Sequence, residues 1–465
     1  MKAVAIVSVS DGRERVHQGL LPVITAHVER LANFLLASNW VNVVVAQTIH
    51  TPEEAQALAA QLRAQGAQLL ICCQPVFGFP HNAVSLIRDL GLPTLLYAPW
   101  EPAYPALVGV LTIGGGLTQM GLAHRRLWGS LDDTETQRQI LAFVRGAGAA
   151  SALHGRVVGQ LGGRSMGLYT TAADGALWQR IFGVDLDHAD QIEIVRRGNI
   201  IAEERAQAGM QWLQRYSQVQ FDGQQLTEAK LLQQVRAYLA TKEIARDLAW
   251  DAVALKCHYE MSEFQVAQCL TTALMNDAHD WEGDKPIIPT SCEADADGAL
   301  TMLALHLMTG ESVALLDVRF FDRSKDVYVL SNCGAAPTSF AGTAGTSWEE
   351  ALRRVVFCPC TSKYLSGGAQ IRMVFAEGEM TLARLTRDPQ GYRMLIARGE
   401  ALALPLEEVE GTNPIWPHAF VHLALRPQEL VEMLEANHVH LVHGDWRQEL
   451  REFCHTTGIR IVEVE

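Results

Sequence analysis

The sequence predicts an α/β protein with two N-terminal doubly wound α/β domains and a C-terminal, mostly β domain. Three observations support this fold class. Short apolar, β-branched runs alternate with helix-period segments over residues 1–150, and the alternation resumes over residues 151–308. Strand-like runs separated by glycine-containing turns dominate residues 309–465. Alternating strands and helices are typical of parallel sheets covered by helices, so we place the domain boundaries near residues 150 and 308.

In the first domain, four apolar runs predict buried parallel strands. Between two of them, a helix is expected to begin after Thr51 as N-cap, with Pro52 in its first position and Gly66 as its stop. The predicted strands cover residues 4–9, 41–46, 68–73 and 93–97.

The second and third domains follow the same logic with different patterns. A strand enters the glycine-rich turn L-G-G-R-S-M-G at 161–167, long amphipathic helices follow, and another strand covers 251–257. From residue 309, strand-like runs replace most helical patterns. The chain closes with a helix, a strand at 438–443, another helix and a last strand.

Length, charge and cysteine content restrict the class of protein. A chain of 465 residues is too long for one core, so two or three domains are expected. Its net charge of −14 argues against nucleic acid or an anionic membrane as the main partner. A small anionic ligand is not excluded, because it needs only a local cation.

The nine cysteines are scattered, and the N-terminus lacks a secretory cleavage pattern. We therefore expect a reducing, cytoplasmic environment. No uncharged apolar run is long enough to span a bilayer, so no membrane partner is expected. The pair Cys358 and Cys360 has no second pair nearby, which favours a reduced loop over a zinc site.

Three acids precede an apolar segment in C-E-A-D-A-D-G. Residues 299–308 are apolar nearly all round, so this helix should be buried, with Gly310 as its C-terminal stop. Either Asp295 or Asp297 is expected to be the N-cap. One cap does not require three acids, so the N-cap role leaves Glu293 unexplained.

Two later segments offer partners for Glu293. Asp317 follows a buried run in A-L-L-D-V-R, where an acid is costly unless it is paired or bound to a cation. The segment A-N-H-V-H-L-V-H holds three histidines; alternation places His438 and His440 on one face and His443 on the other. Carboxylates and imidazole are ligands of Mn²⁺. A shared metal site of Glu293, Asp317 and His438 is one hypothesis, and structural roles for these residues are the other.

At these residues the chain resembles the L-fucose/L-arabinose isomerase superfamily, specifically its fucose isomerase-like branch. The resemblance covers most of the chain. Its motifs are D-G-R at 11–13, L-G-G-R-S-M-G, C-E-A-D-A-D-G, T-G-E-S-V-A-L-L-D-V-R, S-N-C-G-A-A-P and the closing A-N-H. Their order, and the spacing from Glu293 to Asp317, make the match specific.

The resemblance implies an aldose–ketose isomerase with a β-barrel in its C-terminal domain and Mn²⁺ as cofactor, with Mg²⁺ and Co²⁺ as alternatives. Carried over, the metal ligands are Glu293, Asp317 and His438. We expect the two carboxylates to serve also as the catalytic acid/base pair that moves a proton between C1 and C2 through a cis-enediol. The family also implies a homo-oligomer, a trimer or hexamer, with shared active sites, in which Arg13 contributes to a neighbour's pocket.

Other positions are candidates for substrate binding. His258 stands where the family places a substrate-binding glutamine. Arg319 is expected to orient Asp317 or bind a sugar oxygen, or else to form a structural ion pair. Asn437 is a substrate contact or a turn residue. The remaining candidates are two loop tryptophans, each with core packing as the alternative, and a neighbouring histidine: Trp100, Trp416 and His418.

The predicted function is therefore a metal-dependent isomerase of an L-fucose- or D-arabinose-like sugar, or of a C6-modified sugar such as sulfoquinovose. Two rivals remain open: a sugar-binding protein without catalysis, which needs no buried acids, and a metal-dependent aldolase, which cleaves a carbon–carbon bond.

Overall fold

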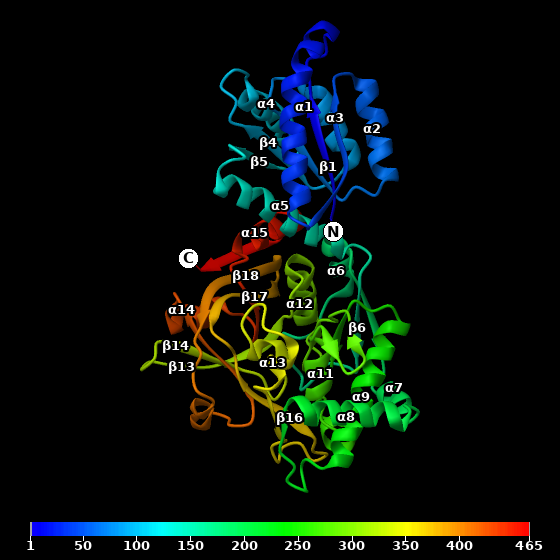
Figure 1. Cartoon of the computed structure of the whole chain (residues 1–465), viewed down its shortest axis with the longest axis vertical. Helices are drawn as coiled ribbons and strands as arrows, with labels where there is room; N and C mark the ends of the chain where they lie inside the picture. The colour runs from blue at the N-terminus through cyan, green and yellow to red at the C-terminus, as the bar shows by residue number, and fades with distance from the viewer. Residues whose placement is uncertain (1, 465) are drawn as a thin grey trace. The chain divides into compact units, whose positions relative to one another are not determined.

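The computed structural model describes residues 2–464, which fold into two compact units. Unit 1 contains the chain up to Ala152 and the segment Gln448–Thr457. Unit 2 contains Leu153–Arg447 and the chain from Gly458 onward. Both units combine helices and strands, and many of their elements are labelled in Figure 1.

Unit 1 is built on one parallel sheet with strand order β2-β1-β3-β4-β5. The strands are β1 (Lys2–Val9), β2 (Val41–Ile49), β3 (Leu69–Cys73), β4 (Thr94–Pro99) and β5 (Arg125–Gly129). The helices are α1 (Glu14–Ala37), α2 (Pro52–Ala64), α3 (Pro80–Leu90), α4 (Ala106–Gln119), α5 (Thr134–Leu153) and α15 (Arg447–Thr457).

Helices cover both faces of this sheet, as the sequence predicts. On β1, Ala5, Val7 and Val9 pack against α2, α3 and α4. Val4 and Ile6 face the other way and pack against α1 and α5. Because alternate side chains of a buried strand need apolar cover on both sides, this arrangement explains why the strand is apolar at every position from 4 to 7.

Helix α2 confirms the predicted capping pattern. Thr51 is its N-cap, and the Thr51 side chain accepts from the backbone N–H of Glu54 at 3.2 Å. The Glu54 side chain accepts in return from the backbone N–H of Thr51, so the two form a capping box. Pro52 occupies the first helical position.

One helix in residues 2–464, α1, is long and apolar enough to cross a membrane by length and composition alone. Its buried positions Ile24, Val28, Leu31 and Leu35 recur every three or four residues and belong to the core of unit 1. That spacing is typical of a helix that packs one face against a sheet, so the case for a membrane span is weak.

Unit 2 begins with a second parallel sheet of order β12-β9-β6-β7. Its strands are β6 (Val157–Leu161), β7 (Asp185–Ala189), β9 (Ala252–Leu255) and β12 (Thr290–Ser291). The associated helices are α6 (Gly175–Phe182), α7 (Ile192–Gly198), α8 (Glu203–Tyr216), α9 (Glu228–Asp247), α10 (Glu260–Phe264), α11 (Cys269–Met275) and α12 (Ala296–Thr309), with a small hairpin of β10 (His279–Asp280) and β11 (Gly283–Asp284).

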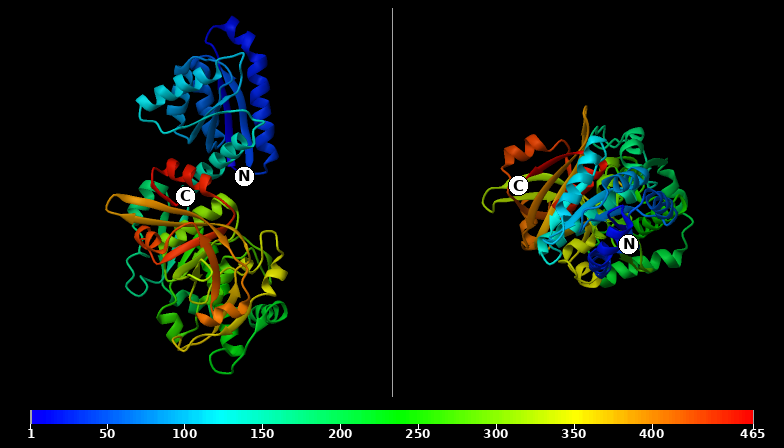
Figure 2. Two further views of the ribbon diagram at one scale, coloured as in Figure 1. Left: turned by 90° about the vertical axis from the view of Figure 1, so that its left-hand side faces the viewer. Right: turned by 90° about the horizontal axis from the view of Figure 1, so that it is seen from above.

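A mixed sheet forms the rest of unit 2. Pairing of β18 with β19 closes part of it into a ring of strands, β18-β17-β20-β13-β14-β19, which confirms the predicted barrel. The long hairpin β17–β18 can be followed in orange in Figure 2. The strands are β8 (Gln218–Val219), β13 (Ala314–Asp322), β14 (Val327–Ser331), β15 (Val356–Pro359), β16 (Ala369–Val374), β17 (Gly378–Asp388), β18 (Gly391–Ala401), β19 (Pro417–Leu423), β20 (His438–His443) and β21 (Arg460–Val464). Short helices connect them: η1 (Thr338–Ala341), α13 (Trp348–Leu352), η2 (Leu406–Gly411) and α14 (Pro427–Met433).

Helix α12 is the buried apolar helix that the sequence predicts. Of its two candidate caps, Asp295 is the N-cap, because the Asp295 Oδ1 atom accepts from the backbone N–H of Gly298 at 2.8 Å. Asp297 instead accepts from Tyr392 at 2.7 Å and from the indole N–H of Trp178 at 3.1 Å. Gly310 ends the helix in the left-handed conformation.

Candidate active site

Three distant segments of unit 2 bring Glu293, Asp317 and His438 to one point. Asp317 on β13 and His438 at the start of β20 are register partners in an antiparallel pair. The Nε2 atom of His438 lies 3.6 Å from Oδ1 of Asp317 and 3.4 Å from Oε2 of Glu293. His438 is buried, and both carboxylate side chains are mostly shielded from solvent.

The turn that carries Glu293 has an unusual backbone. Glu293 and the next residue, Ala294, adopt φ values of +59° and +52°, in the left-handed region that non-glycine residues seldom occupy. Such a conformation costs about 1–2 kcal/mol per residue, so other contacts must hold it. The backbone N–H of Ala294 donates to the carbonyl of Leu255 at 3.0 Å, and the Ser291 hydroxyl donates to the carbonyl of Asp295 at 2.7 Å.

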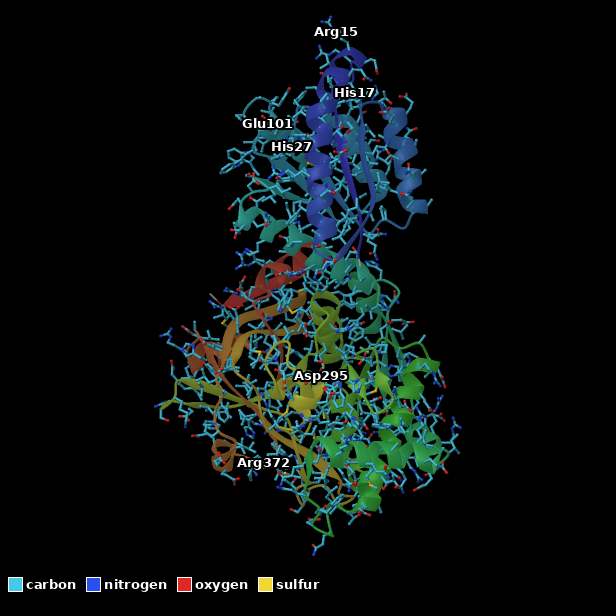
Figure 3. All side chains as sticks on the ribbon, viewed as in Figure 1. Arg15, His17, His27, Glu101, Asp295 and Arg372 are labelled. Carbon is cyan, nitrogen blue, oxygen red and sulfur yellow. The ribbon has the colours of Figure 1, made fainter. Side chains whose placement is uncertain are left out.

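Asp295 fixes the orientation of His438. Its Oδ2 atom lies 2.7 Å from Nδ1 of His438 and also accepts from Arg384 Nη1 at 2.6 Å. Arg384 is fully buried and donates a second bond to the carbonyl of Thr170 at 2.8 Å. Figure 3 labels Asp295 within unit 2. With Nδ1 engaged, the other ring nitrogen of His438 faces Glu293 and Asp317.

The Nε2 atom of His438 is buried and makes no hydrogen bond with any residue from 2 to 464. Its two carboxylate contacts are close but not aligned as hydrogen bonds. An unsatisfied buried polar atom costs about 1–3 kcal/mol, so its retention in the core points to a ligand or a proton at that position.

The charges around His438 favour a positive group there. Burial alone lowers the pKa of His438, but Asp295 and Glu293 outweigh it and raise the pKa to about 10. Burial also opposes ionisation of Asp295, yet the Arg384 guanidinium and His438 hold the pKa of Asp295 well below its usual range. Burial raises the pKa of Asp317 above its usual range, although His438 and Arg319 act in the opposite direction.

Arg319 and Asn437 hold the two oxygens of Asp317. The Nη2 atom of Arg319 lies 3.1 Å from Oδ2 of Asp317, and Nδ2 of Asn437 lies 3.4 Å from Oδ1. Asn437 also accepts from the Thr170 hydroxyl at 3.1 Å. An irregularity in the β13–β14 register falls between Val318 and Phe320, where Arg319 lies. The extra residue of such a bulge re-aims a side chain.

Comparison with known families identifies the chain. A model of the first N-terminal domain of L-fucose isomerase matches residues 1–155, and a model of the L-fucose isomerase C-terminal domain matches residues 330–465. The chain belongs to the L-fucose isomerase family. It is therefore an enzyme, an aldose–ketose isomerase.

Relatives with curated names include two kinds of sugar isomerase. Sulfoquinovose isomerase from Alkalicoccus urumqiensis is 24% identical over 390 residues, covering 80% of this chain and 81% of the relative. L-fucose isomerase from Haemophilus influenzae strain PittEE is 23% identical over 450 residues, covering 82% and 76%. Sulfoquinovose isomerase from Priestia aryabhattai is 22% identical and covers 87% of each chain.

The L-fucose isomerase family is typically metal-dependent, so the fit of a cation to this isomerase can be tested on its own residues. No trio of His, Cys, Asp or Glu side chains in residues 2–464 forms a preassembled metal site. The donor set nevertheless suits a hard or borderline divalent ion, with two carboxylates and one imidazole. Two ligands of one ion, each about 2.2 Å from it, stand roughly 3.1–3.6 Å apart, which is the spacing seen here from His438 Nε2. The residues therefore fit a divalent cation.

The predicted substrate-binding histidines occupy different surroundings in this isomerase. His258 is buried; its Nδ1 lies 3.1 Å from the Ser262 hydroxyl and its ring 5.0 Å from that of Tyr364. Both ring nitrogens of His418 have partners, the Trp416 carbonyl at 2.9 Å and the Thr412 hydroxyl at 2.7 Å. His418 thus fixes the segment that carries Trp416. Substrate contact by either histidine stays a prediction.

Arg13 and Trp100 belong to unit 1 of the isomerase. The Arg13 side chain is 71% exposed and forms an ion pair with Asp11 at 2.7 Å. Trp100 follows β4, is 61% exposed, and its ring lies 6.0 Å from that of Trp128. In the same unit, His27 on α1 lies 3.4 Å from Glu101, and both are labelled in Figure 3. The role of Arg13 and Trp100 in a neighbouring subunit's site stays a prediction.

Sequence reasoning missed several residues that surround the trio in this family member. It considered Asp295 only as a helix cap and did not consider Arg384, although a charged residue inside the apolar run M-T-L-A-R-L was a readable signal. It also missed Cys333, whose thiol lies 4.0 Å from Oε1 of Glu293. A hydrogen bond with Cys292 and, against the effect of burial, another with His258 keep the pKa of Cys333 well below its usual range.

Proposed function

We propose that this enzyme is a metal-dependent aldose–ketose isomerase whose active centre is formed by Glu293, Asp317 and His438. One observation carries the proposal: the buried Nε2 atom of His438, without a hydrogen bond, faces the two carboxylates at 3.4 and 3.6 Å. A non-catalytic sugar-binding protein does not need such a set.

The cation is Mn²⁺, with Mg²⁺ or Co²⁺ as alternatives, and Glu293, Asp317 and His438 would hold it. When bound, it would keep two neighbouring sugar oxygens on one side and stabilise the negative charge that develops on them. His438 contributes a ligand without adding negative charge. Asp295 and Arg384 keep the imidazole ring in place for that role.

Glu293 and Asp317 are proposed to move the proton. In the open-chain aldose, one carboxylate takes the proton from C2, a hydroxyl proton passes from O2 to O1, and the carbon-bound proton equivalent returns to C1, which gives the ketose. Arg319 and Asn437 hold the Asp317 oxygens and so fix the direction of that carboxylate. The strained turn at Glu293 fixes the other carboxylate.

The proposed substrates are L-fucose- or D-arabinose-like aldoses, or C6-modified sugars such as sulfoquinovose. Two names among the relatives support this range, L-fucose isomerase and sulfoquinovose isomerase. The rival reaction, aldol cleavage, uses the same kind of charge stabilisation but releases shorter fragments.

We further propose that a symmetric homo-oligomer completes the sugar site, with Arg13 and Trp100 contributed by a neighbouring subunit. The exposure of both side chains in the single chain supports this assignment. Mixing an inactive Glu293→Gln chain with an inactive Arg13→Ala chain should restore part of the activity. Failure of every such mixture to exceed the parent variants contradicts a shared site.

The decisive experiment incubates the purified enzyme with a panel of aldoses after chelation and after addition of Mn²⁺. Ketose formation that requires the ion supports the proposal, while shorter fragments or no product contradict it. Glu293→Gln and Asp317→Asn should each lower kcat by about 10²- to 10⁴-fold. Glu311→Gln and Asp322→Asn, at exposed or partly exposed acids of the same unit, are matched controls. Near-normal turnover of Glu293→Gln with metal bound would contradict the proton-transfer role of Glu293.

The same ion should stabilise the folded protein. Saturating Mn²⁺ raises the melting temperature by mass action, because the unfolded chain lacks the assembled ligands. His438→Ala should abolish that increase, whereas His443→Ala, on the same strand but with its ring stacked on Phe340, should preserve it. An equal increase in wild type and His438→Ala contradicts the ligand assignment.

A further inference from the structure

Two cationic side chains of unit 2 lie against the ring of Trp416. The guanidinium carbon of Arg319 is 4.8 Å from the centre of that ring, and the ammonium nitrogen of Lys363 is also 4.8 Å away. The three residues come from β13, from the segment just before β19 and from the loop between β15 and β16. Because they are far apart in sequence, this grouping is a product of the tertiary fold.

The two cations differ in how they are neutralised. Arg319 pairs with Asp317 at 3.1 Å. Lys363 has ring contacts, with Trp416 and with Tyr364 at 5.1 Å, but no carboxylate partner within residues 2–464. Another exposed lysine, Lys325, has two carboxylate partners. In a chain with net charge −14, an exposed lysine that lacks an acid and lies on two rings leaves its positive charge available to a ligand.

A hydrogen bond holds the ring of Trp416 in a fixed orientation. Its indole N–H donates to Oε1 of Gln370 at 3.2 Å, and Gln370 donates in turn to the carbonyl of Cys333 at 2.8 Å. Cys333 is the residue whose thiol approaches Glu293. The aromatic ring is therefore tied to the proposed active centre through hydrogen bonds.

A continuous series of contacts leads from the proposed chemistry to Lys363. Asp317 contacts Arg319 at 3.1 Å, Arg319 covers Trp416 at 4.8 Å, and Trp416 contacts Lys363 at 4.8 Å. An open-chain sugar whose C1–C2 end is at Asp317 carries its other end away from that carboxylate. A cation at the end of this series is placed to bind a charged group on the distal carbon.

We infer that Lys363, with Arg319 on the same indole, forms an anion-binding subsite and that the preferred substrate is an aldose with a negatively charged distal substituent. Sulfonate, phosphate and carboxylate share the required chemistry: oxygen acceptors and a negative charge for the ammonium and guanidinium donors. This inference rests on the proposed isomerase function and selects, within its range of sugars, the anionic ones over neutral 6-deoxy sugars.

The test compares charged and neutral aldoses on the Mn²⁺-loaded, full-length enzyme. The charged probes are sulfoquinovose, D-glucose 6-phosphate and D-glucuronate, which separate the three anion types; the neutral probes are D-glucose and L-fucose. At least one charged aldose should have a higher kcat/KM than both neutral sugars. Rising ionic strength should raise KM for the charged sugar alone.

Lys363→Met is the informative variant, because it retains an unbranched chain over the rings and removes the charge. It should lower kcat/KM for the charged aldose by about 10- to 100-fold, mainly through KM, since a charge-assisted hydrogen bond is lost. Turnover of neutral sugars should change by less than about twofold, because these sugars have no charged group for Lys363 to bind. Lys363→Arg should retain most of the preference, and Lys325→Met, the matched exposed lysine, should have no effect.

The outcomes separate this inference from the proposed function. If Lys363→Met turns over neutral sugars and its ratio of kcat/KM for charged to neutral sugars is unchanged, the subsite is overturned and the isomerase proposal stays intact. Lys363 would then only pack on the rings. Calorimetric titration of the same sugars provides a second readout. Lys363-dependent binding of a charged aldose without ketose formation supports the subsite and contradicts the proposed reaction.

Discussion

The carboxylate of Asp295 makes three contacts: it caps helix α12, binds the buried Arg384 side chain and lies 2.7 Å from Nδ1 of His438. The contact with His438 links residues 143 positions apart. It makes Asp295 a residue that positions the His438 ring. Three predictions follow from the surroundings of this carboxylate.

Replacement of Asp295 should weaken metal binding more than it changes the fold. Asp295→Asn keeps an oxygen for the Gly298 cap but removes the charge that holds His438 and Arg384. The affinity for Mn²⁺ should fall about 10- to 100-fold, as expected when the partner of a ligating histidine is lost. Calorimetry measures this change, and circular dichroism checks that the fold persists.

A structural role alone predicts a different result for Asp295→Asn: lower stability with unaltered Mn²⁺ affinity of the folded protein. Asp284→Asn, at an exposed acid that contacts His279 at 2.9 Å, is a matched control for loss of a carboxylate–histidine contact away from the trio. It should leave Mn²⁺ affinity unchanged.

Gly298 is expected to tolerate no side chain. A Cβ atom there would lie 2.7 Å from Oδ2 of Asp295 and 3.0 Å from Nη1 of Arg384, both in the buried network. Gly298→Ala should therefore destabilise the protein by about 1–3 kcal/mol, the usual range for overpacking. Gly175→Ala, also in the first turn of an aspartate-capped helix, meets only Leu186 Cβ at an ordinary 3.7 Å.

Chemical unfolding measures both glycine variants. Gly175→Ala should be neutral or slightly stabilising, because alanine lowers the entropy of the unfolded chain. Equal losses in the two variants would show that the Asp295 network can shift to admit a methyl group.

Asp297 should make stability depend on pH in a defined direction. Burial raises the pKa of Asp297 to about 6, against the hydrogen bond from Tyr392 and the nearby arginines. Its folded pKa is above the unfolded value, so the folded state binds the proton more tightly. The stability that Asp297 contributes is present below about pH 4 and is lost as the pH rises through about 6.

Asp297→Asn removes this dependence. The difference in unfolding free energy between wild type and Asp297→Asn should change by about 2 kcal/mol between pH 4 and pH 7, to the disadvantage of wild type at higher pH. Denaturant titrations at several pH values give that difference. A constant difference over this range would contradict a raised pKa. Asp388→Asn, at a partly exposed acid whose pKa is lowered by its hydrogen bond with Arg460, provides a control of opposite sign.

Much of the fold was predictable because it depends on local patterns. The capped helix α2, the buried helix α12 with its Gly310 stop and the strand β20 at 438–443 all agree with the predicted residues to within a few positions. The fold class follows from such patterns, and the resemblance to the family rests on the order of motifs. The domain boundary near residue 308 remains a prediction.

The candidate site was less accessible to sequence reasoning. Glu293, Asp317 and His438 were named together, and the structure brings them within 3.4–3.6 Å around Nε2 of His438. Their roles remain predictions. Arg384, Cys333 and Lys363 were not named, because each acts through a partner more than 30 residues away, and spacing within one element carries no information about such partners.

The sequence by itself determined the α/β fold class, because periodicity and capping residues are properties of neighbouring positions, and the order of its motifs carried the resemblance to the L-fucose isomerase family. Only the tertiary structure decided that Asp295 rather than Asp297 caps α12, that His438 contacts Asp295 through Nδ1 and faces Glu293 and Asp317 through Nε2, and that two cations lie against the ring of Trp416. Those outcomes depend on which distant strands and loops pack together, and packing is fixed only when the whole core is assembled.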